Sequence, residues 1–117
     1  MSCVANVLIQ FDCLEPDVQN VAKLHEITER LCQQRFRSLV DSRARDLWGG
    51  SKAPECDLFG AAFNYIPLDE FFAELEKLEW ECPNLIRVFV QRQDDNAFGV
   101  WVMREGKMVC VLEADQD

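Results

Sequence analysis

The sequence has only one histidine, His25, and no pair of cysteines in Cys-x-x-Cys spacing. The cysteines are spread widely along the chain: they are Cys3, Cys13, Cys32, Cys56, Cys82 and Cys110. This spacing excludes zinc-finger, zinc-ribbon and thioredoxin-like motifs. Because no secretory leader accompanies the cysteines, we expect reduced thiols in a cytoplasmic protein rather than a disulfide framework. No metal and no cofactor are predicted.

Long hydrophobic runs are also missing, since the apolar stretches extend for only a few residues. A membrane-spanning helix needs about 20 such residues, so we predict no membrane partner. The first residues also lack the basic segment and the long apolar segment that characterise a signal peptide.

Known catalytic signatures are absent as well. The one glycine pair, Gly49–Gly50, follows an expected helix instead of linking a strand to a helix, so no phosphate-binding loop is indicated. His25 and Cys32 are separated by about 10 Å along a helix, which is too far for a catalytic pair. We expect His25 to be partly buried beside Glu29. The sequence predicts no catalytic residue and a protein that is not an enzyme.

The composition is that of a folded protein. The chain has 117 residues, of which 49% are hydrophobic, and it contains eight phenylalanines and three tryptophans. Such a chain can bury a substantial core without metals or disulfides, and it is too apolar to be disordered. We therefore predict a single domain over residues 1–117.

Alternating apolar and polar residues predict five strands. The expected strands cover residues 4–11, 57–66, 85–91, 98–104 and 107–112. Glu105 and Gly106 separate the last two strands, and this two-residue spacing predicts a tight hairpin. Because hairpins join antiparallel strands, we expect a mostly antiparallel sheet.

Helical spacing of apolar residues predicts three helices, over residues 16–36, 38–48 and 68–80. Pro16 suits the first position of the first helix, and the second helix ends at the glycine pair. The predicted order is β-α-α-β-α-β-β-β. The fold class is therefore α+β, with a mostly antiparallel five-stranded sheet and two or three helices on one face.

Charge is distributed unevenly along the chain, whose net charge is −9. Residues 30–52 hold six basic and two acidic side chains, whereas residues 53–83 hold eight acidic side chains and a single lysine, Lys77. The net charges of these segments are +4 and −7. An acidic segment of this kind attracts basic partners and repels phosphate backbones.

The predicted partner-binding residues lie in and just after the helix expected at 68–80. They are Asp69, Glu70, Glu74, Glu76, Trp80 and Glu81. The carboxylates would take the place of substrate phosphates on a basic protein, and Trp80 would be an apolar anchor. Two alternatives stay open: the carboxylates form a solvated helix face, and Trp80 covers the edge of the sheet.

The basic segment contains Arg35, Arg37, Arg43, Arg45 and Lys52. Its few aromatic residues are explained by the core, and the net charge of the chain opposes approach to a polyanion, so no direct nucleic-acid partner is predicted. We expect these cations instead to neutralise part of the acidic segment, in the same chain or in a second copy.

A second interface is predicted on the last hairpin, where Phe89, Trp101 and Met103 share the face opposite the expected core. If the helices cover only one face of the sheet, these side chains are exposed together, and such a patch is typical of an interface. They would support a homodimer. The alternative is that the helix expected at 38–48 or the N-terminal segment covers them.

Together these observations predict an acidic inhibitor that neutralises a basic enzyme, such as a nuclease or toxin, by occluding it. Immunity proteins, antitoxins and phage-encoded inhibitors of nucleic-acid enzymes act in this way. The alternative function is a self-associating structural or adaptor module. A small-ligand-binding protein or an enzyme with a pocket between sheet and helices is the third class, and a pocket holding His25 with a carboxylate would support it.

Overall fold

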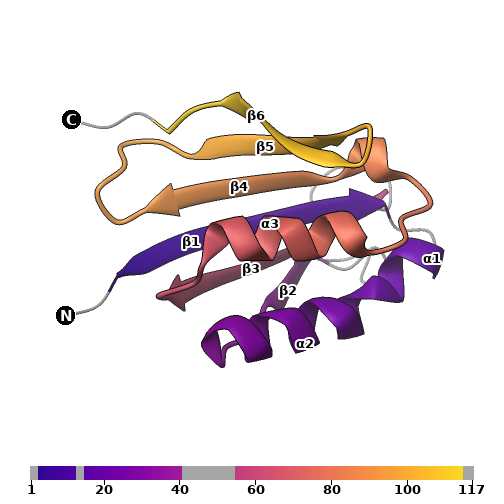
Figure 1. The fold of residues 1–117 in the computed structure, drawn as a ribbon, viewed down its shortest axis with the longest axis horizontal. Coiled ribbons are helices and arrows are strands. Elements are labelled where there is room, and N and C mark those ends of the chain that lie inside the picture. Colours follow the sequence, from indigo (N-terminus) through magenta and orange to yellow (C-terminus); the bar gives the residue numbers. More distant parts are fainter. Residues whose placement is uncertain (1–2, 13–14, 41–54, 115–117) are drawn as a thin grey trace.

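A computed structural model describes residues 3–12, 15–40 and 55–114, and these form one antiparallel sheet with helices on one side (Figure 1). The sheet has six strands in the order β2-β3-β1-β4-β5-β6. The strands are β1 (Val4–Asp12), β2 (Arg37–Val40), β3 (Cys56–Asn64), β4 (Arg87–Arg92), β5 (Gly99–Arg104) and β6 (Lys107–Leu112). All neighbouring strands pair antiparallel, as the sequence predicted.

The helices are α1 (Glu15–Val18), α2 (Asn20–Cys32) and α3 (Leu68–Lys77), and a short 3-10 turn, η2 (Pro83–Leu85), precedes β4. Figure 1 shows α2 and α3 crossing the same face of the sheet. We call this face the inner face and the opposite one the outer face. The α+β class and the helices on one face are therefore confirmed.

The count of five strands was wrong, because residues 37–40 form the edge strand β2 rather than the beginning of a second long helix. Helix α2 ends at Cys32 because Gln33 takes a left-handed conformation with φ of 60° and donates its N–H to Glu29 O. The chain can then reach the free edge of β3. The rest of the helix expected at 38–48 lies outside the described residues.

The core lies between the inner face and the two long helices. In β1 every second residue is buried, and Val7, Ile9 and Phe11 are fully buried. These side chains pack with Leu24 of α2 and Phe71 of α3. The apolar alternation in the sequence thus identified the buried side of β1 correctly.

The last hairpin also has the predicted turn. Glu105 and Gly106 have positive φ values of 51° and 77°, which is the conformation that matches the twist of paired strands. Glycine adopts this conformation without steric cost, and the two-residue loop sets the register of β5 against β6.

The prediction that Phe89, Trp101 and Met103 share one exposed face was wrong. Val88 is the residue opposite Trp101, and directly opposed residues point to the same face, so Trp101 and Met103 lie on the inner face. Met103 is buried in the core, and Trp101 packs against Phe72 of α3 at 5.3 Å between ring centroids. Only Phe89 lies on the outer face. The alternation was ambiguous because β5 is apolar on both faces.

No helix in the described part of the chain is both long enough and apolar enough to span a membrane.

Candidate partner-binding site

The segment that joins α3 to η2 has no regular secondary structure and carries two carboxylates around a tryptophan. Helix α3 ends at Lys77 because Leu78 adopts an extended conformation, with φ of −73° and ψ of 150°. Glu79 and Glu81 are exposed, and Trp80 between them is half-buried. We call residues 78–82 the acidic loop. Trp80 and Glu81 therefore lie in a loop, and not on the helix that was expected to reach residue 80.

Buried Asp17 holds the backbone of this loop. Its side chain has no exposed surface, and its Oδ1 accepts the N–H of Glu81 at 2.6 Å while its Oδ2 accepts the N–H of Cys82 at 3.2 Å. A buried carboxylate is costly unless it is hydrogen-bonded, and these two amides provide the bonds. The position of the loop is therefore set by a residue 64 positions away in the sequence.

Asn20 fixes the other side of the loop. It is 3% exposed, and its Nδ2 donates to Glu79 O at 2.8 Å. Asp17 and Asn20 come from α1 and from the start of α2. Two buried polar side chains from adjacent helices thus fix an irregular backbone segment whose own carboxylates point to solvent.

The ring of Trp80 is also fixed. Its Nε1 donates to Leu75 O at 3.1 Å, and the ring packs on Phe11 with centroids 5.7 Å apart. Trp80 therefore packs on the sheet, but on the end of the central strand β1 and not on the edge of the sheet, which was one of the two alternatives. Trp80 nevertheless stays partly exposed.

A depression of about 450 Å³ lies beside the loop. It is lined by Gln19, Asn20, Lys23, Glu79, Trp80 and Glu81. Two carboxylates next to an indole ring form a suitable environment for an arginine or lysine side chain, through ion pairs and a cation–π contact. Lys23, which also lines the depression, partly offsets the charge of the carboxylates.

Asp12, Asp17 and Cys82 offer ligand atoms within 4.8 Å of one another under the acidic loop. The hydrogen bond to Asp12, with burial and nearby carboxylates, raises the pKa of the Cys82 thiol to about 11. A neutral thiol is a poor metal ligand, and both oxygens of Asp17 already accept backbone amides. We assign this cluster to support of the loop.

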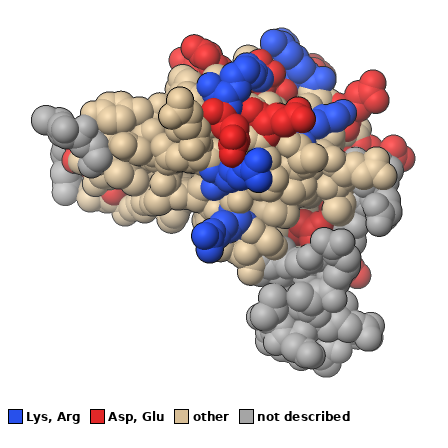
Figure 2. Space-filling view, turned by 90° about the horizontal axis from the view of Figure 1, so that it is seen from below, with Lys and Arg blue, Asp and Glu red and all other residues tan. Residues whose placement is uncertain are grey.

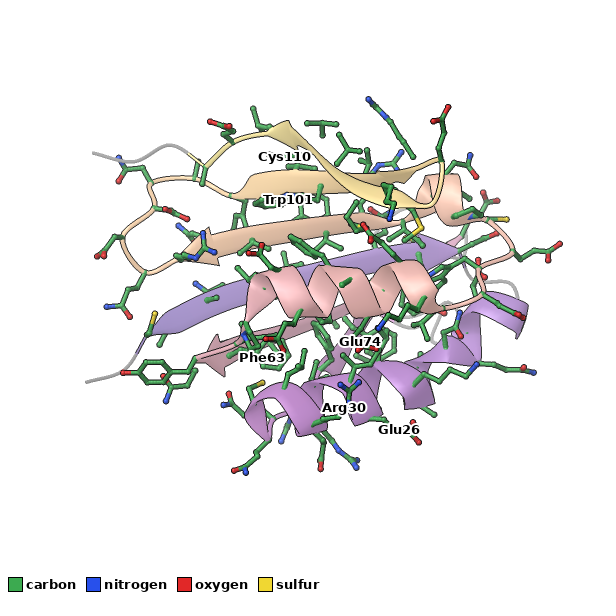
Figure 3. All side chains as sticks on the ribbon, in the orientation of Figure 1. Glu26, Arg30, Phe63, Glu74, Trp101 and Cys110 are labelled. Atoms are coloured by element: carbon green, nitrogen blue, oxygen red, sulfur yellow. The ribbon has the colours of Figure 1, made fainter. Side chains whose placement is uncertain are left out.

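Glu74, one of the predicted binding residues, connects the two long helices. Its Oε2 lies 3.3 Å from the Arg30 guanidinium of α2, and its Oε1 lies 3.6 Å from Lys77 Nζ. Figure 3 shows Arg30 and Glu74 facing each other, with Glu26 turned away from α3. The hydrogen bond to Arg30 lowers the pKa of the Glu74 carboxyl. Part of the acidic segment is thus neutralised within the same chain.

Glu76 connects α3 to the last hairpin. Its Oε2 accepts the backbone N–H of Met108 at 2.7 Å, and its Oε1 lies 3.9 Å from Lys107 Nζ. The side chain is only 21% exposed. Glu76 therefore contributes to holding β6 against the helix layer.

Asp69 and Glu70 lie in the first turn of α3, at the opposite end of the helix from the acidic loop. Both are exposed, and neither forms an ion pair with a cation of the described residues. Carboxylates at this position also stabilise the helix, because they lie at the positive end of its dipole. The six predicted residues thus fall into three groups, two on α3 and one in the acidic loop, rather than on one surface. Figure 2 shows acidic and basic side chains interleaved on the face nearest α2.

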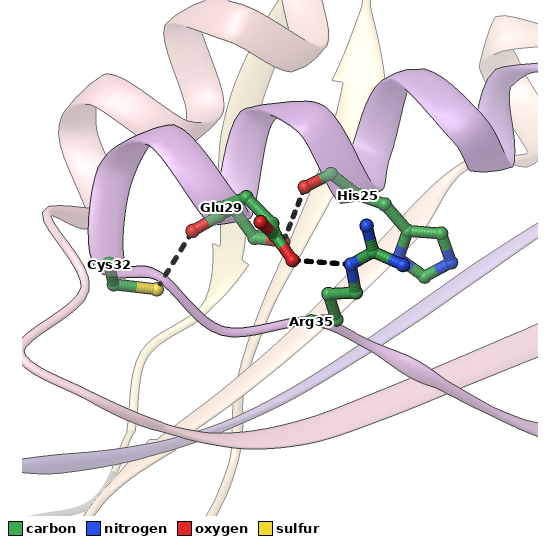
Figure 4. A network of polar contacts seen from close by, with 5 residues as sticks. His25, Glu29, Cys32 and Arg35 are labelled. Carbon is green, nitrogen blue, oxygen red and sulfur yellow. Dashed lines mark hydrogen bonds and ion pairs between the residues drawn. The ribbon is translucent and has the colours of Figure 1, made fainter.

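The single histidine belongs to a separate polar network on α2 (Figure 4). Arg35 Nε donates to Glu29 Oε1 at 2.5 Å, and the His25 ring lies beside them. Burial and the Arg35 charge lower the pKa of His25, and Glu29 opposes them. The expectation of a partly buried histidine next to Glu29 is confirmed.

A larger cavity of about 790 Å³ lies on the outer face beside β2. Leu8, Leu39, Gly60 and Ala62 form part of its apolar lining, and Arg37 adds a charge. Its described lining residues include no cysteine, serine, histidine or carboxylate, so it offers no nucleophile and no acid–base group.

Sequence reasoning did not identify Asp17, Asn20 or Glu79 as members of the site. Asp17 looked like an ordinary acid in the first turn of a helix, and nothing in the spacing links it to residues 79–82. The one available signal was that Glu79 points toward the apolar stripe of a continued helix, which indicates that the helix ends before it.

No protein-family model, no curated protein and no solved structure matches this chain.

Proposed function

We propose that this protein binds a basic protein partner through the acidic loop and inhibits that partner by occlusion, as an immunity protein, an antitoxin or a phage-encoded inhibitor does. A basic enzyme such as a nuclease or toxin is the partner class. The observation that carries the proposal is the use of buried Asp17 and Asn20 to hold an exposed, irregular loop, whose carboxylates, Glu79 and Glu81, form no ion pair with another of the described residues.

A loop fixed in advance loses little conformational entropy on binding, and this favours affinity. An arginine or lysine of the partner would enter the depression, pair with Glu79 or Glu81, and stack on Trp80. The net charge of −9 would accelerate the encounter, so affinity should fall as salt slows association.

In this proposal the six residues singled out in the sequence have different roles. Trp80 and Glu81 contact the partner together with Glu79. Asp69 and Glu70 contribute to the long-range field. Glu74 and Glu76 stabilise the fold through their bonds to Arg30 and Met108.

The test begins with capture of partners from host lysate on the tagged full chain, washed at low and at high salt, followed by affinity measurement with the purified partner. Reversing both loop charges, Glu79→Lys with Glu81→Lys, should weaken binding about 30-fold or more, because each lost ion pair is replaced by a repulsion.

The matched control is Glu26→Lys, an exposed carboxylate on α2 that turns away from α3. It should change the affinity by less than about threefold, through the general field alone. Equal effects at Glu26 and at the loop would contradict a specific site, and an unchanged affinity of the loop variant would contradict the proposal.

A further inference from the structure

The cavity of about 790 Å³ on the outer face lies along β3, between the neighbouring strands β2 and β1. We call it the outer cavity. Helices α2 and α3 cross the inner face, so neither of them covers it (Figure 1). Its volume falls within the range of about 300–1,000 Å³ that is typical of small-molecule sites.

Small residues of β3 form the floor of the outer cavity. Gly60 and Ala62 are successive outward positions of this strand. Gly60 lies opposite Leu8 of β1 and also opposite Arg37 of β2, and directly opposed residues share a face of the sheet. A large side chain therefore stands on each side of a position that has none, and this difference in size hollows the surface.

Two leucines give the cavity aliphatic walls. A Cβ atom at Gly60 would lie 2.7 Å from Leu39 Cδ1 and 2.9 Å from Leu8 Cδ2, so both leucines lean over the glycine. Among the described glycines only Gly106 has a positive φ, so the backbone conformation does not require a glycine at position 60. We attribute Gly60 to the close approach of these side chains, which is a common reason for a glycine within a strand.

The charges that line the outer cavity are all positive. Its described lining residues include Arg35 and Arg37 and no carboxylate, although the chain has 21 acidic side chains and a net charge of −9. Arg35 is held by Glu29 of α2 (Figure 4). Arg37 is exposed and forms no ion pair with another described residue, so its guanidinium can bind an anion.

We propose that the outer cavity binds a single-chain organic anion, such as a carboxylate with an aliphatic chain. The chain lies along β3 over Gly60 and Ala62, between Leu8 and Leu39. The carboxylate pairs with Arg37, whose planar guanidinium can donate to both oxygens at once. Burial of the chain supplies affinity, and the charge selects an anion over a cation of the same shape.

The hollow shape favours a single molecule over a lipid bilayer, because a bilayer contacts the most prominent side chains and leaves a hollow unfilled. The site goes beyond the proposed inhibitor function and shares no residue with the acidic loop. Either proposal can therefore fail without the other.

The first measurement is an NMR titration of the full chain with sodium decanoate, kept below the concentration at which it forms micelles. The amide signals of Gly60 and Ala62 should shift and reach saturation with a single dissociation constant. Decyltrimethylammonium has the same chain with a cationic head. It should bind about tenfold more weakly or worse, because its charge meets Arg37, even though the net charge of the protein attracts it.

A charge reversal tests the role of Arg37. Arg37→Glu should raise the dissociation constant of decanoate about tenfold or more, because an ion pair is replaced by a repulsion. Arg104→Glu is the matched control, since it makes the same change at an exposed position of β5 that does not line the cavity. It should change the constant by less than about threefold, through the general field alone.

A change of size tests the floor of the cavity without altering its charge. Ala62→Phe places a ring where the aliphatic chain would lie and should raise the dissociation constant of decanoate about tenfold or more. Ala22→Phe makes the same change at an exposed alanine of α2 and should leave the constant unchanged. Circular dichroism confirms the fold of each variant.

An absence of saturable shifts at Gly60 and Ala62 would overturn the proposal. Equal affinities for decanoate and decyltrimethylammonium, equal effects of Arg37→Glu and Arg104→Glu, or full affinity in Ala62→Phe would each overturn it too. A protein that binds phosphatidylglycerol vesicles but not monomeric decanoate would have a membrane-binding surface instead, and this result would overturn the proposal equally.

Discussion

The carboxylates inside α3 and those in the acidic loop belong to one acidic stretch of sequence, but they have different surroundings. Glu74 and Glu76 bind Arg30 and the Met108 amide, so their charges are used within the fold. Glu79 and Glu81 are exposed, and only the backbone of their loop is held, by Asp17 and Asn20. The two regions differ in backbone support rather than in the local density of charge, and our proposal that the acidic loop binds a partner depends on this difference.

The largest expected effect is at Asp17. Asp17→Asn keeps the size of the side chain but places an amide donor against two N–H groups, so the free energy of unfolding should fall by about 2–3 kcal/mol. Urea denaturation measures this. Asp69→Asn, an exposed carboxylate in the first turn of α3, is the control and should cost about 0.5 kcal/mol or less. Equal effects of the two changes would contradict the assigned role of Asp17.

A smaller effect is expected at Glu76, and it separates stability from binding. Glu76→Ala removes the acceptor of the Met108 N–H and should cost about 1 kcal/mol in urea denaturation. Glu70→Ala makes the same change at an exposed position of α3 and should be close to neutral.

The effect of Glu76→Ala on stability is to be compared with its effect on the affinity for a basic partner. This affinity should change little in Glu76→Ala and fall clearly in Glu79→Ala, whose stability should stay within about 0.5 kcal/mol of the unaltered protein. If Glu76→Ala instead abolishes binding while the fold is intact, the division between the two regions is wrong.

Most of the fold could be predicted from the sequence, because the patterns that indicate its strands, helices and turns are local. Alternation in β1, the stripe in α3 and the Glu105–Gly106 turn each depend on neighbouring residues. The edge strand β2 was missed because its pairing with β3 is a tertiary contact that overrides the helical spacing at residues 38–40. The prediction assigned the side chains of β5 to the wrong faces of the sheet, because both faces of this strand are apolar. Only the hydrogen-bonded register with β4 decides which face is which.

Only part of the candidate site could be predicted from the sequence. The acidic stretch and Trp80 stand out in the composition of residues 53–83. The bonds from Asp17 and Asn20 to the loop span 64 and 59 positions, and no spacing rule links such residues. Nor does the sequence tell which carboxylates find a cation, because that depends on how α2 lies against α3.

A weaker effect is expected on acidification, at the contact between α2 and α3. The hydrogen bond to Arg30 lowers the pKa of Glu74 in the folded state. The bond therefore stabilises the fold fully at pH values above the pKa that Glu74 has in the unfolded chain, and this stabilisation is lost as the pH falls through the pKa of the folded state. A carbon-detected NMR titration should show the Glu74 carboxyl titrating below the ordinary range of a glutamate. Arg30→Gln should move the Glu74 midpoint upward, and an unmoved midpoint would contradict the contact.

The smallest effect is expected at His25, whose Nδ1 is buried and has no hydrogen-bond partner among the described atoms. Burial and Arg35 lower the pKa of His25 in the folded state, so the unfolded chain takes up the proton first as the pH falls. The free energy of unfolding should therefore decrease slightly when the pH drops below about 6.5. The only imidazole in the sequence gives unambiguous NMR signals. Arg35→Gln should raise its midpoint and Glu29→Gln should lower it, and the opposite directions would contradict the network.

The most direct test of the central claim is amide hydrogen exchange of Glu81 and Cys82. These N–H groups lie in an exposed loop without regular structure, yet both donate to buried Asp17. A loop held in this way should protect both amides at a level near that of the β1 strand, and Asp17→Asn should remove the protection. Exchange at the rate of an unstructured peptide in the unaltered protein would contradict a loop arranged in advance for a partner.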